Sequence, residues 1–368
     1  MKKILAGVAI SAVCLYLVLR GVHWGDIPSY LAYMNLGLLA LAMLGMVGAY
    51  ACMAWRWRYL LAPLIAGPPP SFAALFGTTM TGYFFNTFFP ARAGDLMRAH
   101  LMSQRTGLSR TTILATVVIE KLFDGVALLI LLVVGIPALQ IGGGGAVQLG
   151  VAAVVVLALA LGGLLLFRWQ ADRLVALTAR LVDLLPLPER IGSLAVRLVH
   201  MFSAGLQVFA TPGPLIRSAA ISLLVWIVAA GMFWAALASF SDPALIPTNL
   251  SALLLMTAFV NLGLLIPAMP GNVGNYEALI VTAFVLIFPA PNKDKVVAFA
   301  LVFHAAQLIA TLVVGGLAFW SQHVSLRDVR ADAAEAVARA PSAAAADLRD
   351  HIHRPARDEA AELGIEKL

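Results

Sequence analysis

The sequence predicts an all-α membrane protein whose chain crosses the bilayer several times. Of its 368 residues, 61% are hydrophobic and only 12% are charged, whereas a soluble domain has about 25% charged residues. The apolar residues form long separate blocks, several of which approach or exceed the roughly 20 residues that a helix needs to cross a bilayer. A soluble core cannot bury so many separate blocks. We therefore expect a polytopic protein with about six full transmembrane helices and two shorter helical hairpins.

The charge and the cysteines exclude several other classes. The formal net charge is +6, which lysine and arginine in cytoplasmic loops explain in a membrane protein. No basic stretch alternates with exposed aromatic residues, so we expect no nucleic-acid partner. Cys14 and Cys52 are the two cysteines, and both lie inside apolar blocks. They can build neither a disulfide framework nor a metal site.

Nine apolar blocks follow one another along the chain. The first lacks an Ala-x-Ala cleavage site, so we expect it to stay as a span. If every block were a complete span, four arginines behind the third block would face outward, against the positive-inside bias. These are Arg92, Arg98, Arg105 and Arg110. The blocks are 4–19, 36–61, 72–89, 112–136, 147–167, 215–240, 250–266, 278–288 and 296–320.

The third block is therefore predicted to be the first arm of a re-entrant hairpin. In FFNTFFPARAGDLMRAH (84–100), Pro90 stands directly behind the apolar block, and proline breaks helices. If the block enters from the cytoplasm and turns at Pro90, a second short helix returns and the arginines stay cytoplasmic. Gly94 loosens the turn. The new helix, beginning near Asp95, presents unpaired N–H groups that suit an anion.

A second segment has the same pattern. In NLGLLIPAMPGNVGNYEALIVTAF (261–284), Pro270 and Gly274 repeat the spacing of Pro90 and Gly94, again after an apolar block and before an acidic residue. Because a full span precedes it, this hairpin enters from outside. Paired broken helices of opposite orientation are typical of inverted-repeat transporters with a site near the midplane. Two ordinary proline-kinked spans in each region are the alternative interpretation.

The other segments complete the domain organisation. Repeat-like halves at about 36–136 and 215–320 belong to a membrane domain, 1–322. The segment 147–210 joins the halves through a span and two amphipathic helices, which we expect on the cytoplasmic leaflet. The tail, 323–368, is rich in alanine and mixed in charge, so we expect a partly helical or disordered cytoplasmic extension.

The strongest polar signal is TVVIEKLFDGVALLI (116–130), which places Glu120, Lys121 and Asp124 inside an apolar helix. A charge inside a span costs a few kcal/mol and faces an interior or a cavity. Spacings of three and four residues gather the three side chains on one side of the helix. They line a polar pathway, pairing with the arginines of the preceding hairpin, or they form a self-neutralising cluster that fixes the helix register.

The first hairpin adds candidate ligands for a phosphate. Arg92 and Arg98 flank the helix start at Asp95, and the planar guanidinium can donate two parallel hydrogen bonds to a phosphate. The alternative is that both are loop arginines that follow the positive-inside bias.

The second hairpin and the last span supply the remaining candidates. The polar tip of the hairpin contains Asn272, Asn275, Tyr276 and Glu277. Either asparagine can simply cap the new helix, whereas an apolar block follows the glutamate directly. His304 and Gln307 lie three residues apart in the last span. The histidine either titrates in a pathway or is a hydrogen-bonded structural residue.

Enzyme signatures are missing from the sequence. It contains no His-Glu-x-x-His, P-loop or Gly-x-Ser-x-Gly motif and no Cys/His cluster at metal-binding spacing. We therefore predict no catalytic residue, no metal site and no cofactor. An intramembrane transferase that uses Glu120 or Glu277 as a base is the alternative.

Three stretches carry a resemblance to a known family: FFPARAGDLMRAHLM, VVIEKLFDGVALLIL and IPAMPGNVGNYEALI. From about 36 to 320, the chain resembles the transmembrane region of lysylphosphatidylglycerol synthases, whose stand-alone members are called flippase-like proteins. The motifs of this family fall on Pro90, Gly94 and Asp95, on Glu120, Lys121 and Asp124, and on Pro270, Gly271, Gly274 and Glu277. Lys121 stands where arginine is usual.

The resemblance implies a multi-span domain that moves lipids with charged, phosphorylated or modified headgroups between leaflets. Full-length synthases carry a large soluble aminoacyl-transfer domain after the membrane part, where this chain has a short tail, so we expect translocation rather than synthesis. We expect a bacterial inner (plasma) membrane, and the positive-inside bias places both termini in the cytoplasm. The expected partners are membrane lipids and a lipid-synthesis enzyme. An intramembrane lipid-modifying transferase or a membrane scaffold for such an enzyme is the alternative.

Overall fold

The computed structural model describes residues 2–65, 67–89, 92–138, 212–247, 249–265, 270–288 and 292–322, with scattered positions between 148 and 162. The chain divides into two compact units, Met1–Ala171 with Phe202–Gln322 and Asp172–Met201 with His323–Leu368. The second unit lies outside the described residues, as do the predicted tail and most of the predicted connecting segment. The fold described below is that of the first unit.

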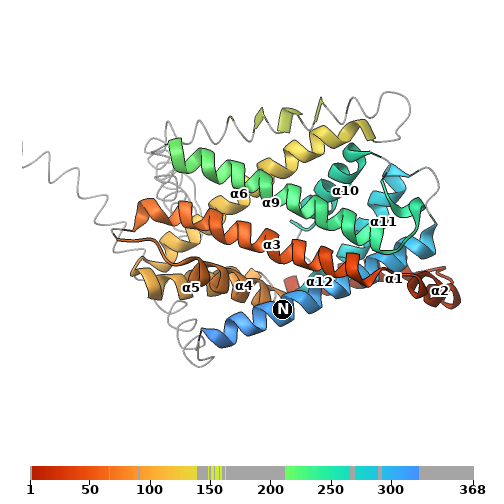
Figure 1. The fold of residues 1–368 in the computed structure, drawn as a ribbon, viewed down its shortest axis with the longest axis horizontal. Coiled ribbons are helices and arrows are strands. Elements are labelled where there is room, and N and C mark those ends of the chain that lie inside the picture. Colours follow the sequence, from red (N-terminus) through yellow and green to blue (C-terminus); the bar gives the residue numbers. More distant parts are fainter. Residues whose placement is uncertain are drawn as a thin grey trace, which may run out of the picture. The chain divides into compact units, whose positions relative to one another are not determined.

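Every described secondary-structure element is helical (Figure 1). The α-helices are α1 (Lys2–Leu19), α2 (Ile27–Ala32), α3 (Leu36–Leu61), α4 (Phe72–Phe88), α5 (Ala93–Thr106), α6 (Arg110–Gly135), α9 (Pro212–Ser239), α10 (Leu250–Gly263), α11 (Asn275–Ile287) and α12 (Lys293–Ser321). Within the described residues, three helical stretches are long and apolar enough to span a membrane: Leu36–Leu64, Gly213–Ser239 and Lys293–Ser321. The predicted all-α membrane fold is confirmed.

Side-chain caps fix where several of these helices begin. The side-chain oxygens of Asn35, Ser71, Ser109, Asn249 and Asn292 each accept a backbone N–H from the first turn of α3, α4, α6, α10 and α12, respectively. Such a cap satisfies one of the N–H groups that a helix start leaves unpaired and contributes about 1 kcal/mol. These five helices therefore start directly behind a polar capping residue.

Four helices are too short to cross a bilayer and form two hairpins. α4 and α5 have 17 and 14 residues, and α10 and α11 have 14 and 13, against the roughly 20 residues that a span requires. The backbones of α4 and α5 nearly touch: a Cβ atom on Gly94 would stand 1.8 Å from the carbonyl oxygen of Gly82. The predicted break at Pro90 falls outside the described residues.

The second hairpin turns through backbone that favours glycine. A short 3-10 turn, η7 (Pro270–Asn272), precedes α11. Gly271, Asn272 and Gly274 have φ angles of 70°, 56° and 84°, a region that glycine adopts without the steric cost of a Cβ atom. Gly274 also faces α1, because a Cβ atom there would stand 2.4 Å from the Ser11 carbonyl oxygen.

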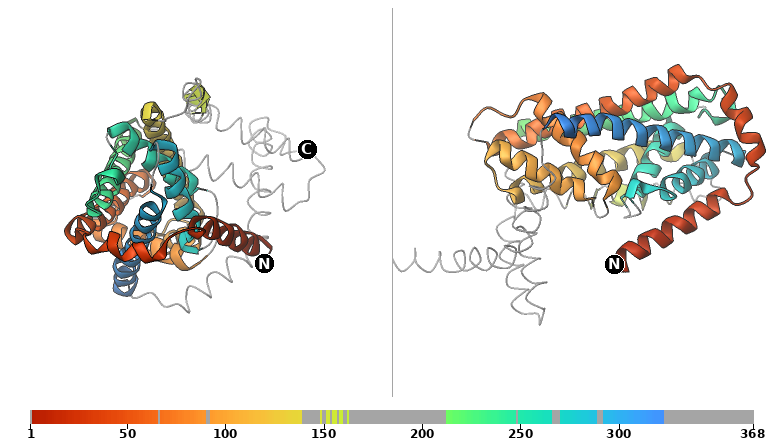
Figure 2. Two further views of the ribbon diagram at one scale, coloured as in Figure 1. Left: turned by 90° about the vertical axis from the view of Figure 1, so that its right-hand side faces the viewer. Right: turned by 90° about the horizontal axis from the view of Figure 1, so that it is seen from below.

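The two hairpins start from opposite ends of the bundle (Figures 1 and 2). At end A, the Arg105 guanidinium near the end of α5 donates to the Gln322 side chain, which follows α12 (3.2 Å). At end B, the Asn35 backbone N–H before α3 donates to the Ser239 carbonyl at the end of α9 (2.6 Å). The α4–α5 hairpin begins and finishes at end A, whereas α10 follows α9 from end B and α11 returns there.

The tips of the hairpins meet, and α12 packs against both. Arg92, at the start of α5, donates to the Leu264 carbonyl at the end of α10 (3.5 Å). A Cβ atom on Gly271 would lie 3.6 Å from the Thr87 carbonyl oxygen of α4. On α12, Phe319 packs against Phe85 of α4, with 5.3 Å between ring centroids. Nearer the start of α12, Phe299 packs against Phe284 of α11 (6.1 Å).

Candidate functional site

The charged residues of α6 lie in the bundle interior, and the first of them is paired with the preceding hairpin. Arg98 of α5 donates from Nη1 and Nη2 to the two carboxylate oxygens of Glu120 at 3.0 and 3.2 Å. The exposed fractions of the two residues are 2% and 1%. The guanidinium also lies over the Trp57 ring, 4.2 Å from its centroid. This is a bidentate, charge-assisted contact of the strong kind.

This pairing changes the role expected for Arg98. A phosphate ligand needs free donors, but the Nη groups of Arg98 are engaged by Glu120 and the side chain is closed off from solvent and lipid. Removing one partner of such a pair costs about 3–5 kcal/mol because a charge is left buried and alone. Of the Arg98 donors, only Nε has no hydrogen-bond partner among the described residues. Arg98 joins α5 to α6.

Asp124 is paired with a buried arginine of α3. Arg56 lies inside α3, is fully buried, and donates from Nη1 and Nη2 to the Asp124 carboxylate at 2.5 and 3.3 Å. Its Nη1 also donates to the Ser222 hydroxyl of α9 (2.7 Å). Arg56 therefore joins three helices.

Lys121 and Asp95 carry the charges that this cluster leaves open. Both side chains are partly buried, and Lys121 interacts electrostatically with Asp95, Glu120 and Asp124. The Lys121 ammonium lies 5.8 Å from the centroid of the Tyr83 ring. Among the described residues, neither Lys121 nor Asp95 has a hydrogen-bonded or ion-paired side-chain partner. The cluster thus combines two closed ion pairs, in which each carboxylate is bound by an arginine, with one open cation and one open carboxylate. Here open means that the charged group has no hydrogen-bonded or ion-paired side-chain partner among the described residues.

A second polar cluster joins the second hairpin to α12. Glu277 and His304, which are 3% and 5% exposed, approach each other to 2.6 Å between Oε1 and Nδ1. The other carboxylate oxygen accepts the backbone N–H of Gly274 (2.6 Å), and His304 Nε2 lies 2.9 Å from the Gly271 carbonyl oxygen. This contact ties the hairpin tip to the middle of α12.

The other predicted residues of this hairpin lie around the same cluster. Gln307 of α12 donates to the Tyr276 hydroxyl (2.6 Å), and the Tyr276 ring lies 4.5 Å from the His304 ring. Neither asparagine is the helix cap, because Gly274 occupies that position and Glu277 accepts its N–H. Asn275 has a buried side-chain nitrogen with no hydrogen-bond partner in the described part of the chain.

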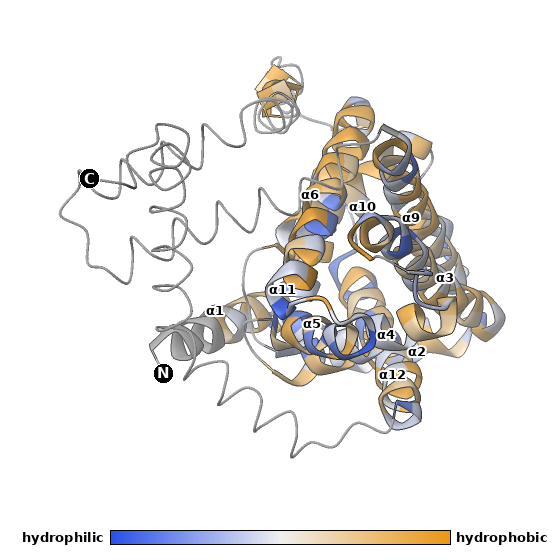
Figure 3. Cartoon of the chain, turned by 90° about the vertical axis from the view of Figure 1, so that its left-hand side faces the viewer, coloured by the Kyte–Doolittle hydropathy of each residue, from blue (hydrophilic) through white to orange (hydrophobic). Residues whose placement is uncertain are grey.

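Two tyrosines lie between the clusters. The rings of Tyr83 on α4 and Tyr50 on α3 are 4.3 Å apart between centroids. Tyr83 is the ring beside Lys121, whereas Tyr50 interacts electrostatically with Tyr276. Neither tyrosine was singled out in the sequence, because tyrosine is ordinary in an apolar block. In Figure 3, hydrophobic colours dominate the described helices and hydrophilic ones mark α5 and the middle of α6.

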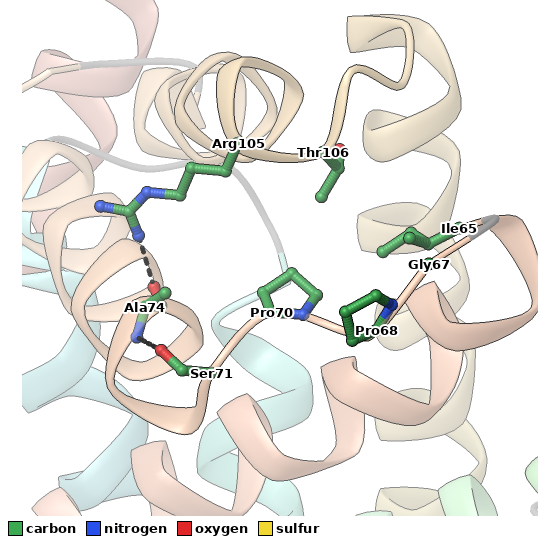
Figure 4. A pocket seen from close by; sticks show the side chains of 8 residues that line it. All are labelled: Ile65, Gly67, Pro68, Pro70, Ser71, Ala74, Arg105 and Thr106. Atoms are coloured by element: carbon green, nitrogen blue, oxygen red, sulfur yellow. Dashed lines mark hydrogen bonds between the residues drawn. The ribbon is translucent and has the colours of Figure 1, made fainter.

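A separate pocket of about 430 Å³ opens at end A. Its walls come from the connection before α4 and from the end of α5, and none of the twelve predicted site residues lines it. As Figure 4 shows, Arg105 reaches across α4 and donates to the Ala74 carbonyl (3.0 Å). Arg105 also donates to the Thr78 hydroxyl (3.2 Å). The Arg105 side chain therefore joins α5 to α4 at this end.

Comparisons with known proteins agree with the motifs. A family model described as the lysylphosphatidylglycerol synthase TM region matches residues 4–315. A curated relative, Glycosyltransferase AglD of Haloferax volcanii, is 26% identical over 368 aligned positions, which cover 90% of this chain and 56% of the relative. The chain therefore spans about half the length of that protein.

Proposed function

Because the chain belongs to the family of lysylphosphatidylglycerol synthase transmembrane regions, we propose that it moves a lipid with a charged, phosphorylated or modified headgroup between the two leaflets of a membrane. The family itself gives the chain a lipid-related role in a membrane. Translocation is the specific activity that the arrangement of its polar residues supports best.

The observation that carries the proposal is the open pair, Lys121 and Asp95, at a re-entrant hairpin. A phospholipid headgroup must lose much of its hydration to cross the hydrocarbon, so a path needs polar groups that replace water. Lys121 can donate to the phosphate, and Asp95 can accept from an amine or hydroxyl of the headgroup. The neighbouring closed pairs hold these two groups in place and leave no additional net charge there.

The two clusters together give the path a direction across the bilayer. Lys121 and Asp95 belong to the half that starts at end A, and Glu277 and His304 to the half that starts at end B. Because the hairpin tips touch, a headgroup leaving one half reaches the other near the bilayer midplane, as in transporters built from opposed broken helices. The acyl chains stay in the surrounding lipid throughout.

The test is leaflet exchange in vesicles. The full chain, purified and reconstituted into liposomes, is expected to accelerate the transfer of a fluorescent phosphatidylglycerol between leaflets, as followed by quenching of the outer leaflet. The matched control is the same preparation with Lys121→Gln and Asp95→Asn combined, which is expected to fall towards the protein-free rate. Equal rates for wild type, variant and protein-free vesicles would overturn the proposal.

A second candidate is transfer of a group to a lipid within the membrane. It is favoured by the name of the relative, a glycosyltransferase. Under this alternative, vesicles supplied with a sugar donor would accumulate a lipid of higher mass. Mass spectrometry of the same liposomes distinguishes the two activities, since translocation leaves every lipid mass unchanged.

A further inference from the structure

The contact between Glu277 and His304 fixes how many protons the two side chains share. His304 Nε2 faces the Gly271 carbonyl oxygen at 2.9 Å. A carbonyl only accepts hydrogen bonds, so Nε2 carries a hydrogen. At the other ring nitrogen, Nδ1 lies 2.6 Å from the carboxylate oxygen of Glu277. Two lone pairs would repel each other at this distance, so one proton lies between the two atoms.

Burial makes that proton hard to remove while the site is closed. Glu277 and His304 are 3% and 5% exposed. With the shared proton the pair is neutral overall, as a carboxylate with an imidazolium or as a carboxylic acid with an imidazole. Without it, one uncompensated negative charge would remain in the interior, which is strongly unfavourable in a low dielectric.

Among the described residues, no other ionised group contacts the pair. α4, which packs against the hairpin tip, and α10, the other arm of the hairpin, contain no charged residue. The charges of α1 and α12 lie at the starts of these helices: Lys2, Lys3, Lys293, Asp294 and Lys295. The titratable neighbours are Tyr276, on the same helix as Glu277, and Tyr50 on α3. Arg92 reaches the same hairpin, but its contact is with the Leu264 carbonyl.

The shared proton also lies where the tip of the second hairpin contacts α12. Glu277 accepts from Gly274 and His304 faces Gly271, so both glycines that allow the turn are held through this pair. Gly271 and Gly274 have positive φ angles of 70° and 84°. Loss of the proton would remove the hydrogen bond between Glu277 and His304, one of the contacts that tie the hairpin to α12, the helix that also packs against the first hairpin.

We propose that Glu277 and His304 form a proton-binding site and that binding and release of this proton at the hairpin joint is coupled to lipid movement. The coupling rests on the proposed translocation, whereas the binding site itself does not. In each cycle one proton enters the closed pair from one side of the membrane and leaves when the tip separates from α12. No nucleotide or metal ion is needed for this step.

The binding site is tested without any transport assay. The full chain, labelled with ¹⁵N-histidine, contains seven histidines, and His304→Gln identifies the His304 signal. In the Glu277→Gln variant the carboxylate is lost but the shape is kept, so the pH dependence of the His304 signal is expected to differ from that of the wild type. An unchanged titration of His304 in that variant would overturn the proton site.

The coupling is tested in liposomes with an imposed pH gradient. The ratio of exchange rates with and without the gradient is expected to exceed one in the wild type and to fall to one in Glu277→Gln and His304→Gln. Asp242→Asn, which removes an ion pair in a loop at end B, is the matched carboxylate control and should keep the wild-type ratio.

A gradient-dependent ratio that persists in both variants would overturn the coupling alone, as would wild-type exchange whose rate does not depend on the gradient. Absence of any exchange would overturn the proposed translocation and leave the histidine titration to decide the proton site.

Discussion

Glu120 and Asp124 lie one helical turn apart on α6, yet each is neutralised from a different direction. Arg98 arrives from the preceding hairpin and Arg56 from α3. Lys121, between them in sequence, has no such partner among the described residues. Arginine suits the closed positions because its planar fork matches a carboxylate, whereas lysine is a compact charge on a flexible stem. In this cluster the arginines therefore form the structural ion pairs, whereas the lysine is the cation without a partner.

Replacing Lys121 by glutamine is expected to impair lipid movement without unfolding the protein. The loss of a charge-assisted hydrogen bond to phosphate, worth about 1.5–3 kcal/mol, predicts leaflet exchange at least about tenfold slower. The free energy of unfolding should change by less than about 1 kcal/mol, because Lys121 makes no hydrogen bond or ion pair with a described side chain and loses only its cation–π contact with Tyr83. The control is Arg58→Gln, an exposed arginine of α3, which should change neither quantity. A Lys121→Gln variant with the wild-type exchange rate would contradict the assignment.

The pair formed by Arg56 and Asp124 is expected to be structural. Arg56→Met alone should lower the free energy of unfolding in detergent micelles by about 3–5 kcal/mol, because Asp124 is left buried without its partner. Arg56→Met combined with Asp124→Leu should cost less than the single change, since the unpaired charge is gone. A double variant as unstable as the sum of the single changes would show that the two residues do not act as a pair.

The carboxylates of this cluster could be predicted from the sequence, whereas the arginine that pairs with Asp124 could not. Intramembrane carboxylates stand out against an apolar block, so Glu120 and Asp124 were visible. The partner of Asp124 lies 68 residues away, and no local pattern specifies such a contact. A signal for Arg56 was nevertheless present, because a charge inside an unbroken apolar block is buried or lines a cavity.

At the scale of helices, the apolar blocks located most elements but missed their first turns. α9, α11 and α12 begin at Pro212, Asn275 and Lys293, three residues before the blocks predicted at 215, 278 and 296. The first turn of a helix is often polar, because its free N–H groups are satisfied by caps and by water. Hydropathy alone cannot recognise that turn, whereas a capping side chain such as that of Asn292 before α12 does mark it.

Gly94 and Gly82 are expected to determine whether the first hairpin closes. Gly94→Ala would place a methyl group 1.8 Å from the Gly82 carbonyl oxygen, so α4 and α5 must separate. We expect a loss of stability of at least about 1–3 kcal/mol, as for other overpacked contacts. Gly231→Ala on α9 is the control, because open space surrounds that position, and it should be neutral or stabilising by up to about 1 kcal/mol. Thermal unfolding in detergent compares them, and equal midpoints would contradict the close crossing.

The loop between α9 and α10 is expected to loosen in acid. The Lys295 ammonium donates to Asp242, and this hydrogen bond lowers the pKa of the Asp242 carboxylate. A lowered pKa means that the contact stabilises the fold above the ordinary pKa of aspartate, about 3.9, and that this contribution disappears as the pH falls through the lowered value. Asp242→Asn should remove this pH dependence. The pair is partly exposed, so its contribution should stay below about 1 kcal/mol; a larger difference between the unfolding curves of the two proteins would contradict this.

For the molecule as a whole, the distribution of charge predicted more than the pattern of single residues did. The positive-inside bias alone favoured a hairpin over a span at 72–89, and α4 and α5 are indeed separate short helices. The bias could not predict which helix holds the two hairpins together. α12 does so through aromatic contacts with α4 and α11, and these depend on packing between distant segments rather than on any local signal.

Opposed hairpins predict that ends A and B face different sides of the membrane, with end A in the cytoplasm. Gln104, exposed near the end of α5, marks end A, and Ala244, exposed in the loop after α9, marks end B. In a protein with Cys14 and Cys52 replaced by alanine, Gln104→Cys should react with an impermeant maleimide only in inside-out vesicles. Ala244→Cys should react only in right-side-out vesicles, because α9, at 28 residues, is long enough to separate the two positions by a full bilayer. Labelling of both cysteines from one side would mean that the hairpins enter from the same face, and a path that passes a headgroup from one tip to the other could not cross the membrane.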